Sequence, residues 1–437
     1  MRIAMIGGGY VGLVSGACFA EFGVDVAVVE VDPTRLAALR EGRMPIYEPG
    51  LEDLVRSNVA AGRLTFGADI AAAMHGAEAV FIAVGTPTRR GDGHADLSYV
   101  YAAAEQVARA MTGYAVVVTK STVPVGTGRR IAEIIAATRP DLEFDVASNP
   151  EFLREGNAIG DFMKPDRVVI GAASDRARAT MQRLYAPIAA AAPILFTGIE
   201  TAELTKYAAN AFLAMKVTFI NEIADLCERT GADVLEVAHG IGLDARIGAR
   251  FLQPGPGFGG SCFPKDTLAL VRIAQEAGAP SRLVETVVAV NDARKSGMAA
   301  RIIAACGGAV RGKTIAILGL TFKPETDDMR DSPAIPIVSR LAEDGALVRV
   351  YDPEGMAAAK PLLPRNIICC RDAIDAATGA DATVLITEWS QFRALSPIAL
   401  AGAMRGKLLI DLRNIYDPVA MRQAGLEYHG VGRGGMK

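Results

Sequence analysis

The sequence predicts an α/β protein in which two Rossmann-like, doubly wound domains are joined by a helical central domain with a long connecting helix. Three observations support this. Short β-branched strands alternate with Ala-rich segments before residue 198, the same alternation returns after residue 300, and residues 200–230 between them lack Gly and Pro. A chain of 437 residues exceeds one ordinary domain. We expect domains at 1–198, 199–300 and 301–437.

The strands expected in the first domain are short and apolar, and helix-like sequence separates each from the next. They are residues 2–6, 24–32, 78–87 and 115–124. A further strand is expected just before residue 148. Strands that alternate with helices indicate a parallel sheet with helices on both faces.

The central run from Glu200 to Thr230 is closed by Gly231, and Thr197 with Glu200 is typical of a capping box at its start. A helix of this length extends roughly 45 Å at 1.5 Å per residue, so we interpret it as a connecting helix and a dimer surface. After it, the strands expected are 313–320, 347–353, 381–389 and 407–418, which loosely repeat the first domain.

Composition excludes several classes of protein. The net charge is −3, with 46 basic and 49 acidic residues, which argues against a nucleic-acid or anionic-membrane binder.

The apolar N-terminus superficially resembles a signal peptide, but its regularly spaced glycines explain it better, and no apolar run reaches membrane-spanning length. Six scattered cysteines without a Cys-x-x-Cys pair, and only four histidines, favour a metal-free protein in the reducing cytoplasm. Cys369 and Cys370 are expected in a reduced core.

The segment 7-GGGYVG-12 predicts a dinucleotide site through Gly7, Gly9 and Gly12. It follows a strand and opens a helix, so its glycines allow a tight turn, close approach of a pyrophosphate, and packing of helix on strand. Glu30 ends the next strand, where its carboxylate would bind the ribose hydroxyls and favour NAD. Arg35 nearby weakens that preference, because an arginine accommodates the phosphate of NADP.

Two threonines follow later strands of the same sheet. Thr86 lies in 85-GTP-87 and Thr122 in 121-STVPVGT-127. Ligands of open α/β sheets bind beyond the carboxyl ends of strands, so both are expected to face the cofactor.

Three further stretches contain residues whose role, structural or functional, is not decided by the local sequence. If residues 148–162 are helical, Glu151 and Glu155 share a face, either as a solvated helix start or as a site. Lys206 and Asn210 lie four residues apart on the long helix, and Lys206 either extends to water or is held in a site. Cys262, in 258-FGGSCFPKD-266, is either an inert buried thiol or a nucleophile activated by Lys265 and Asp266.

The motifs GGGYVG, KSTVPVGT, NPEFLREG, FGGSCFPKD and 316-AILGLTFKPETDDMRDSP-333 occur in this order. Together they resemble the nucleotide-sugar 6-dehydrogenases, most closely the members that act on UDP-glucose. The resemblance covers nearly the whole chain. It implies an N-terminal NAD-binding domain, a dimerising helical centre and a C-terminal domain that binds UDP.

The resemblance also implies a reaction and its residues. The family oxidises the C6 alcohol of the sugar to a carboxylate and reduces two NAD. An aldehyde must gain a nucleophile before it loses a second hydride, and Cys262 matches that nucleophile. Lys206 and Asn210 match stabilisers of the oxyanion. Asp266, Thr122 and Glu151 match groups that move protons or position water.

The binding residues also follow from the resemblance. Those matched to the cofactor are Gly7, Gly9, Val11, Gly12, Glu30, Arg35, Thr86, Thr122, Glu155, Lys265 and Arg330. Those matched to UDP-glucose are Glu151, Phe152, Leu153, Arg154, Glu155, Lys206, Asn210, Phe251, Leu252, Gln253, Pro254, Gly255, Gly259 and Lys323, with Arg246 reaching substrate from the partner subunit of a homodimer.

The sequence departs from the family pattern at two places, and three other functions are considered beside the oxidation of UDP-glucose. Glu30 stands where many relatives have Asp, and the segment 251-FLQPGPGFGG-260 is rich in proline, which bears on sugar preference. The alternatives are the same chemistry on GDP-mannose or a UDP-N-acetylhexosamine, a non-catalytic nucleotide-sugar sensor, and a single-step hydroxy-acid or 3-hydroxyacyl dehydrogenase. The last two have no use for Cys262.

Overall fold

The structure is a computed structural model that describes residues 1–89 and 93–433. It divides into two compact units. The first comprises Met1–Ala209 and Arg272–Ala279, and the second comprises Asn210–Val271 and Pro280–Lys437. The three-part division at residues 198 and 300 stays a prediction.

Within the described residues, the first unit holds an eight-stranded sheet with the order β3-β2-β1-β4-β5-β6-β7-β8. All pairings are parallel except that of β6 with β7. Sequence reasoning missed β3, β7 and β8; of these, β3 and β8 are short and partly exposed. The strands are β1 (Arg2–Ile6), β2 (Asp25–Val29), β3 (Leu64–Gly67), β4 (Ala79–Ile82), β5 (Ala115–Thr119), β6 (Phe144–Ser148), β7 (Val168–Ala172) and β8 (Ile194–Thr197).

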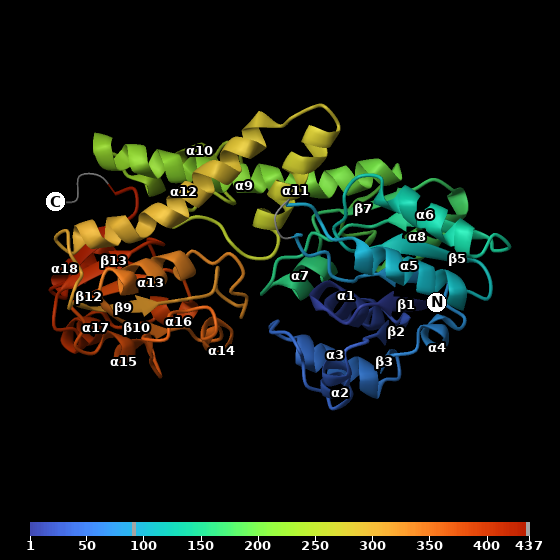
Figure 1. The fold of residues 1–437 in the computed structure, drawn as a ribbon, viewed down its shortest axis with the longest axis horizontal. Coiled ribbons are helices and arrows are strands. Elements are labelled where there is room, and N and C mark those ends of the chain that lie inside the picture. Colours follow the sequence, from blue (N-terminus) through green and yellow to red (C-terminus); the bar gives the residue numbers. More distant parts are fainter. Residues whose placement is uncertain (90–92, 434–437) are drawn as a thin grey trace. The chain divides into compact units, whose positions relative to one another are not determined.

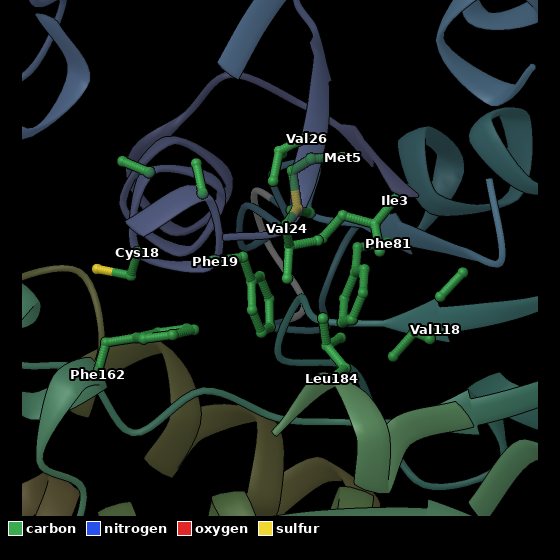
Figure 2. Close-up of a cluster of buried hydrophobic side chains, with 14 of the residues drawn as sticks. Ile3, Met5, Cys18, Phe19, Val24, Val26, Phe81, Val118, Phe162 and Leu184 are labelled. Carbon is green, nitrogen blue, oxygen red and sulfur yellow. The ribbon is translucent and has the colours of Figure 1, made fainter. Parts of the chain in front are cut away.

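Alternate residues of the central strands enter two separate cores, one on each face of the sheet. Ile3, Met5 and Phe81 belong to one core, whereas Ala4 and Ile6 belong to the other. Figure 2 shows the first core, where aromatic rings from helices pack against strand residues. Burial on both faces explains why these strands are almost entirely apolar.

The helices of the first unit cover both faces, as the sequence predicts (Figure 1). One face is covered by α1 (Tyr10–Glu21), α3 (Leu51–Ala60), α7 (Ala158–Met163) and α8 (Asp175–Leu184). The other is covered by α4 (Ile70–Met74), α5 (Ser98–Ala110) and α6 (Thr127–Thr138). A shorter helix, α2 (Pro33–Arg40), follows β2.

The long helix is confirmed as α9 (Ile199–Thr230), an unbroken helix of 32 residues. It extends about 48 Å at 1.5 Å per residue. The expected capping box is wrong. Thr197 is the last residue of β8 and Gly198 precedes the helix, so Thr197 lies one position too early to act as the cap.

Within the described residues, the second unit holds a six-stranded, wholly parallel sheet with the order β11-β10-β9-β12-β13-β14. This order repeats that of the first six strands of the chain, so the expected second Rossmann-like domain is confirmed. Only the two edge strands were missed. The strands are β9 (Thr314–Leu318), β10 (Leu347–Tyr351), β11 (Ile368–Cys369), β12 (Ala382–Leu385), β13 (Leu408–Asp411) and β14 (Glu427–Gly430).

This sheet also separates two cores. One face is packed by α9, α10 (Val234–Gly242), α12 (Arg282–Ala305) and α13 (Ala334–Glu343). The other is packed by α15 (Ala373–Ala377), α16 (Ser390–Arg393), α17 (Pro397–Ala403) and α18 (Pro418–Gln423). Cys370 is buried there, but Cys369 is exposed on the edge strand, so only one of this pair lies in the core.

Across residues 1–89 and 93–433, no helix has both the length and the hydropathy needed to cross a membrane.

Candidate functional site

The glycine turn between β1 and α1 contains three glycines with different constraints. Gly7 has φ +111°, and a Cβ there would lie 2.6 Å from the carbonyl oxygen of Ala83. A Cβ on Gly12 would lie 1.9 Å from the carbonyl oxygen of Gly7. Nothing lies within 4 Å of a Cβ on Gly9. The protein's own packing therefore requires Gly7 and Gly12, whereas Gly9 leaves open space for a ligand. Val11 is half-buried in the first turn of α1.

Glu30 follows β2 and is buried against this turn. Its Oε1 accepts a hydrogen bond of 2.8 Å from the Asp32 amide, and its Oε2 would lie 2.9 Å from a Cβ on Gly8. Gly8 thus makes room for the carboxylate, a role that the motif does not specify. Arg35 is exposed on α2, and its amide donates to the Asp32 side chain.

The structure brings Thr86 and Thr122 together, as expected of residues at the ends of neighbouring strands. The Thr86 hydroxyl donates to the Thr122 carbonyl over 3.0 Å. This bond joins the loops that follow β4 and β5, because each threonine lies just beyond its strand. Thr86 is buried and Thr122 half-buried.

Glu151 and Lys206 form a buried ion pair of 3.1 Å between Oε1 and Nζ. Lys206 is 2% exposed, so it is held in a site and does not extend to water. A buried pair of this kind makes each charge depend on the other. The Lys206 Nζ also lies 5.3 Å from the ring centre of Phe152, a distance that permits a cation–π contact.

The condition that Glu151 and Glu155 lie on one helix is not met. Residues 149–157 form loop and turn, and helix begins only with α7 at Ala158. The Glu151 carboxylate accepts the Leu153 amide at 2.5 Å, and this local bond competes with helix formation. Glu155 is half-buried, and the exposed Arg154 pairs with Asp161.

Glu48, which sequence reasoning missed, anchors this loop. It is buried and accepts amide hydrogen bonds of 2.7 Å from Gly156 and from Ala158. The Tyr10 hydroxyl in the glycine turn donates to the same carboxylate. No local pattern singles out Glu48, because its partners come from distant parts of the chain.

A second group of predicted residues lies in the second unit. The Asn210 Nδ2 donates to Asp266 Oδ2 over 2.6 Å, and Lys265 Nζ donates to Asp266 Oδ1 over 2.6 Å. Asp266 is 1% exposed, so its carboxylate depends on these two donors. Helix α9 carries Asn210 one turn after Lys206.

Cys262 immediately precedes α11 (Phe263–Glu276). It is half-buried, and its carbonyl accepts the Asp266 amide at 2.8 Å, which forms the first turn of the helix. The unpaired amides at a helix start favour a negative charge, and hence a thiolate. By contrast, burial raises the pKa of the Cys18 thiol to about 12, as expected of an inert core cysteine.

The segment before Cys262 is held rigidly. The Gly255 amide donates to Asn221 Oδ1 over 2.8 Å, and its carbonyl accepts from Arg294 Nε at 2.7 Å. Phe251 adopts φ +65°, which is unusual for a non-glycine residue and marks a constrained site. Leu252 and Pro254 are buried, and Gln253 is exposed.

We expect Gly257, Gly259 and Gly260 to let the backbone before Cys262 approach a ligand, and the structure gives these glycines a second reason. A Cβ on Gly259 would lie 2.4 Å from the carbonyl oxygen of Asp331, and one on Gly260 would lie 2.6 Å from the Phe322 ring. Gly257 has φ +114° and packs against Asn291. The protein's own packing therefore requires these glycines, independently of any ligand.

Of three further predicted contacts, Arg330 and Lys323 belong to the segment that packs on the glycines before Cys262, since the Arg330 carbonyl accepts the Gly260 amide at 2.8 Å and Lys323 follows Phe322. The Arg246 side chain is 90% exposed and pairs with Asp244. Arg330 pairs with Asp328 at 2.8 Å. Lys323 is half-buried, with its Nζ 5.3 Å from the ring centre of Phe322. Within the part of the chain that the structure describes, no cluster of His, Cys, Asp and Glu is arranged to hold a metal ion.

Comparison with known proteins gives consistent matches along the chain. Three models of the UDP-glucose/GDP-mannose dehydrogenase family match: the NAD binding domain at residues 1–189, the central domain at 200–293 and the UDP binding domain at 316–418. The first of these is direct support for NAD as the cofactor.

Full-length relatives agree with these matches. A UDP-glucose 6-dehydrogenase of Rhizobium meliloti is 59% identical over 436 residues, covering 99% of this chain and 100% of that protein. The UDP-glucose 6-dehydrogenase TuaD of Bacillus subtilis is 46% identical, covering 99% and 93%. A solved UDP-glucose dehydrogenase from Pyrobaculum islandicum is 40% identical with a TM-score of 0.91, covering 99% and 97%. The chain therefore belongs to the UDP-glucose/GDP-mannose dehydrogenase family.

Proposed function

We propose that the protein oxidises UDP-glucose at C6 to UDP-glucuronate with two molecules of NAD per sugar. The observation that carries this proposal is Cys262 at the start of α11, one turn before the buried Asp266. A single-step dehydrogenase needs no such nucleophile. The curated relatives that match the full chain are UDP-glucose 6-dehydrogenases, which supports this choice of sugar and base.

The chemistry assigns Cys262 a defined role. NAD supplies the hydride acceptor for both oxidations. The Cys262 thiolate adds to the C6 aldehyde, and its sulfur–carbon bond gives a thiohemiacetal. Loss of hydride from that carbon leaves a thioester, and water then releases the carboxylate and restores the thiol. The chain must therefore stabilise an oxyanion at C6 and supply water to the thioester.

The buried polar residues suit these tasks. Lys206 and Asn210 supply donors to the oxygen on C6, where negative charge develops. Asp266 and Glu151 are buried carboxylates suited to accept a proton or to orient water. We assign Thr122 as a further group that moves a proton or positions water.

The assignment of binding residues follows the same family match. For NAD, the open space at Gly9 and the buried Glu30 suit a pyrophosphate and a ribose. We assign Val11, Arg35, Thr86, Glu155, Lys265 and Arg330 as further cofactor contacts. We assign residues 151–155, 251–255, Gly259 and Lys323 to UDP-glucose.

We also propose a homodimer, supported by exposed apolar residues on α9. Phe212, Phe219 and Leu226 are 58%, 49% and 54% exposed. Their spacing of seven residues places them on one face of the helix, as in a helix-packing seam. A second copy of the chain would cover this face, and the exposed Arg246 would then reach the substrate of that copy. A cytoplasmic location stays a prediction, supported by six free cysteines.

The stoichiometry of NADH tests the function. With UDP-glucose and excess NAD, we expect two NADH for each sugar consumed, measured by absorbance and by chromatography of UDP-glucuronate. One NADH would indicate a single-step dehydrogenase, and none would indicate a sensor. Faster turnover of GDP-mannose or a UDP-N-acetylhexosamine would overturn the choice of substrate.

The nucleophile is tested by Cys262→Ser. We expect the variant to stall after the first oxidation or to accumulate a covalent adduct, because the alkoxide leaves far less readily than a thiolate. Mass spectrometry of the intact protein detects the adduct. Cys369→Ser is the matched control, since Cys369 is exposed on an edge strand. Formation of UDP-glucuronate at the parent rate by Cys262→Ser would contradict the assignment.

Two glycine variants separate cofactor binding from folding. Gly9→Ala has space for its methyl group, so it should keep the parent melting temperature but bind NAD at least tenfold more weakly. Gly12→Ala brings Cβ to 1.9 Å from a carbonyl oxygen and should lower the melting temperature. Calorimetry without and with NAD makes both measurements. Unchanged NAD affinity in Gly9→Ala would place the cofactor elsewhere.

The dimer is tested by Phe219→Glu. A charge on the apolar face of α9 should convert dimer to monomer in sedimentation velocity, because the carboxylate would be desolvated in the interface. Ile398→Glu is the control, since Ile398 is 76% exposed on α17, away from α9. A monomeric parent protein, or a variant that remains dimeric, would contradict the proposed surface.

A further inference from the structure

Lys120 is a buried cation that the proposed chemistry does not use. It directly follows β5 and is 4% exposed. Its Nζ donates to Asn149 Oδ1 over 3.0 Å and to the Tyr185 hydroxyl over 3.3 Å. Among the described residues, no carboxylate lies within ion-pair distance of it. Burial of a charged lysine without an ion pair costs free energy of folding. A buried, perturbed cation of this kind is a candidate for a functional role.

Two charged groups of the proposed active site, Glu151 and Lys206, act on Lys120 electrostatically. Burial lowers the pKa of Lys120 to about 8, with Glu151 opposing this shift and Lys206 adding to it. The same small cavity is also lined by Asp161 and Arg167. Burial raises the pKa of Tyr185, so that group stays neutral at working pH.

Asn149 transmits the position of Lys120 to the loop that carries Glu151. Its Oδ1 accepts from Lys120 and, at 2.5 Å, from the Tyr185 hydroxyl. Its Nδ2 donates to the Val169 carbonyl on β7 over 2.8 Å. Only Pro150, with its fixed φ, separates Asn149 from Glu151, so the orientation of one limits that of the other.

The space beside Lys120 is too small for a substrate. The cavity lined by Lys120, Asn149, Glu151 and Phe152 has a volume of about 40 Å³. This is room for little more than water, and far less than a sugar nucleotide requires. A cavity of this size favours a role of Lys120 through its neighbours over direct contact with the substrate.

We propose that Lys120 is a positioning residue for the Glu151–Lys206 pair. Its hydrogen bond to Asn149 sets the course of the segment 149–152, and with it the position of the Glu151 carboxylate beside Lys206. What the pair does in turnover rests on the proposed function, but the effect of Lys120 on this segment does not.

The test compares Lys120→Met, which removes charge and hydrogen bond, with Lys120→Gln, whose amide can still donate to Asn149. With UDP-glucose and NAD, we expect Lys120→Met to lose at least tenfold in kcat, and Lys120→Gln to recover most of that loss. Lys164→Met, at an exposed lysine, is the control.

Amide hydrogen exchange of residues 149–156, without substrate or cofactor, supplies a readout independent of turnover. We expect faster exchange in Lys120→Met than in the parent, Lys120→Gln or Lys164→Met. Parent-like exchange in Lys120→Met would overturn the proposal. If Lys120→Met does not fold, Asn149→Ala, which removes the acceptor of the Lys120 hydrogen bond, takes its place in the exchange experiment, and parent-like exchange there would overturn the proposal. If the parent does not oxidise UDP-glucose, the function fails while the exchange data still decide the role of Lys120.

Discussion

The structure depends on burial of both faces of two sheets. Side chains of β1 and β9 alternate between separate cores, so the central strands have almost no polar positions. Polar side chains of the first sheet therefore lie mainly in the segments that follow its strands. The glycine turn follows β1, Glu30 follows β2, and Thr122 follows β5. The same rule places ligands at the carboxyl ends of strands in sheets of this kind.

A site built on loops must be made rigid by other means, and here buried polar side chains serve that purpose. Glu48 accepts two backbone amides of the loop after Glu155, and Asn221 with Arg294 fixes Gly255. Asn149, bonded to Lys120, fixes the approach to Glu151. Each anchor satisfies backbone or side-chain groups that would otherwise be buried without partners. Burying these polar groups costs free energy of desolvation, but their hydrogen bonds hold the loops in a defined geometry.

Helix α9 fixes the spacing between two proposed catalytic residues. It carries Lys206, paired with Glu151, and one turn later Asn210, paired with Asp266. An α-helix keeps residues four apart on one face, so the spacing of these two donors is set by backbone hydrogen bonds and not by a loop. For a proposed oxyanion, donors on a rigid helix need little reorganisation when charge develops.

Sequence alone determined the alternation of strands and helices, the long helix with Lys206 on it, the glycine turn and the motif that carries Cys262, because these depend on periodicity and local spacing. It missed the short edge strands and the buried strand β7, and it left open whether residues 151–155 are helical, where the bond from the Leu153 amide to Glu151 favours a loop. Only the tertiary structure showed that Lys206 is held by Glu151, that Gly259 and Gly260 are needed for packing, and that Lys120 and Glu48 are buried anchors. The partners of these residues lie far away in the sequence, and the free energy of a charged group depends on its burial. Neither can be read from the local sequence.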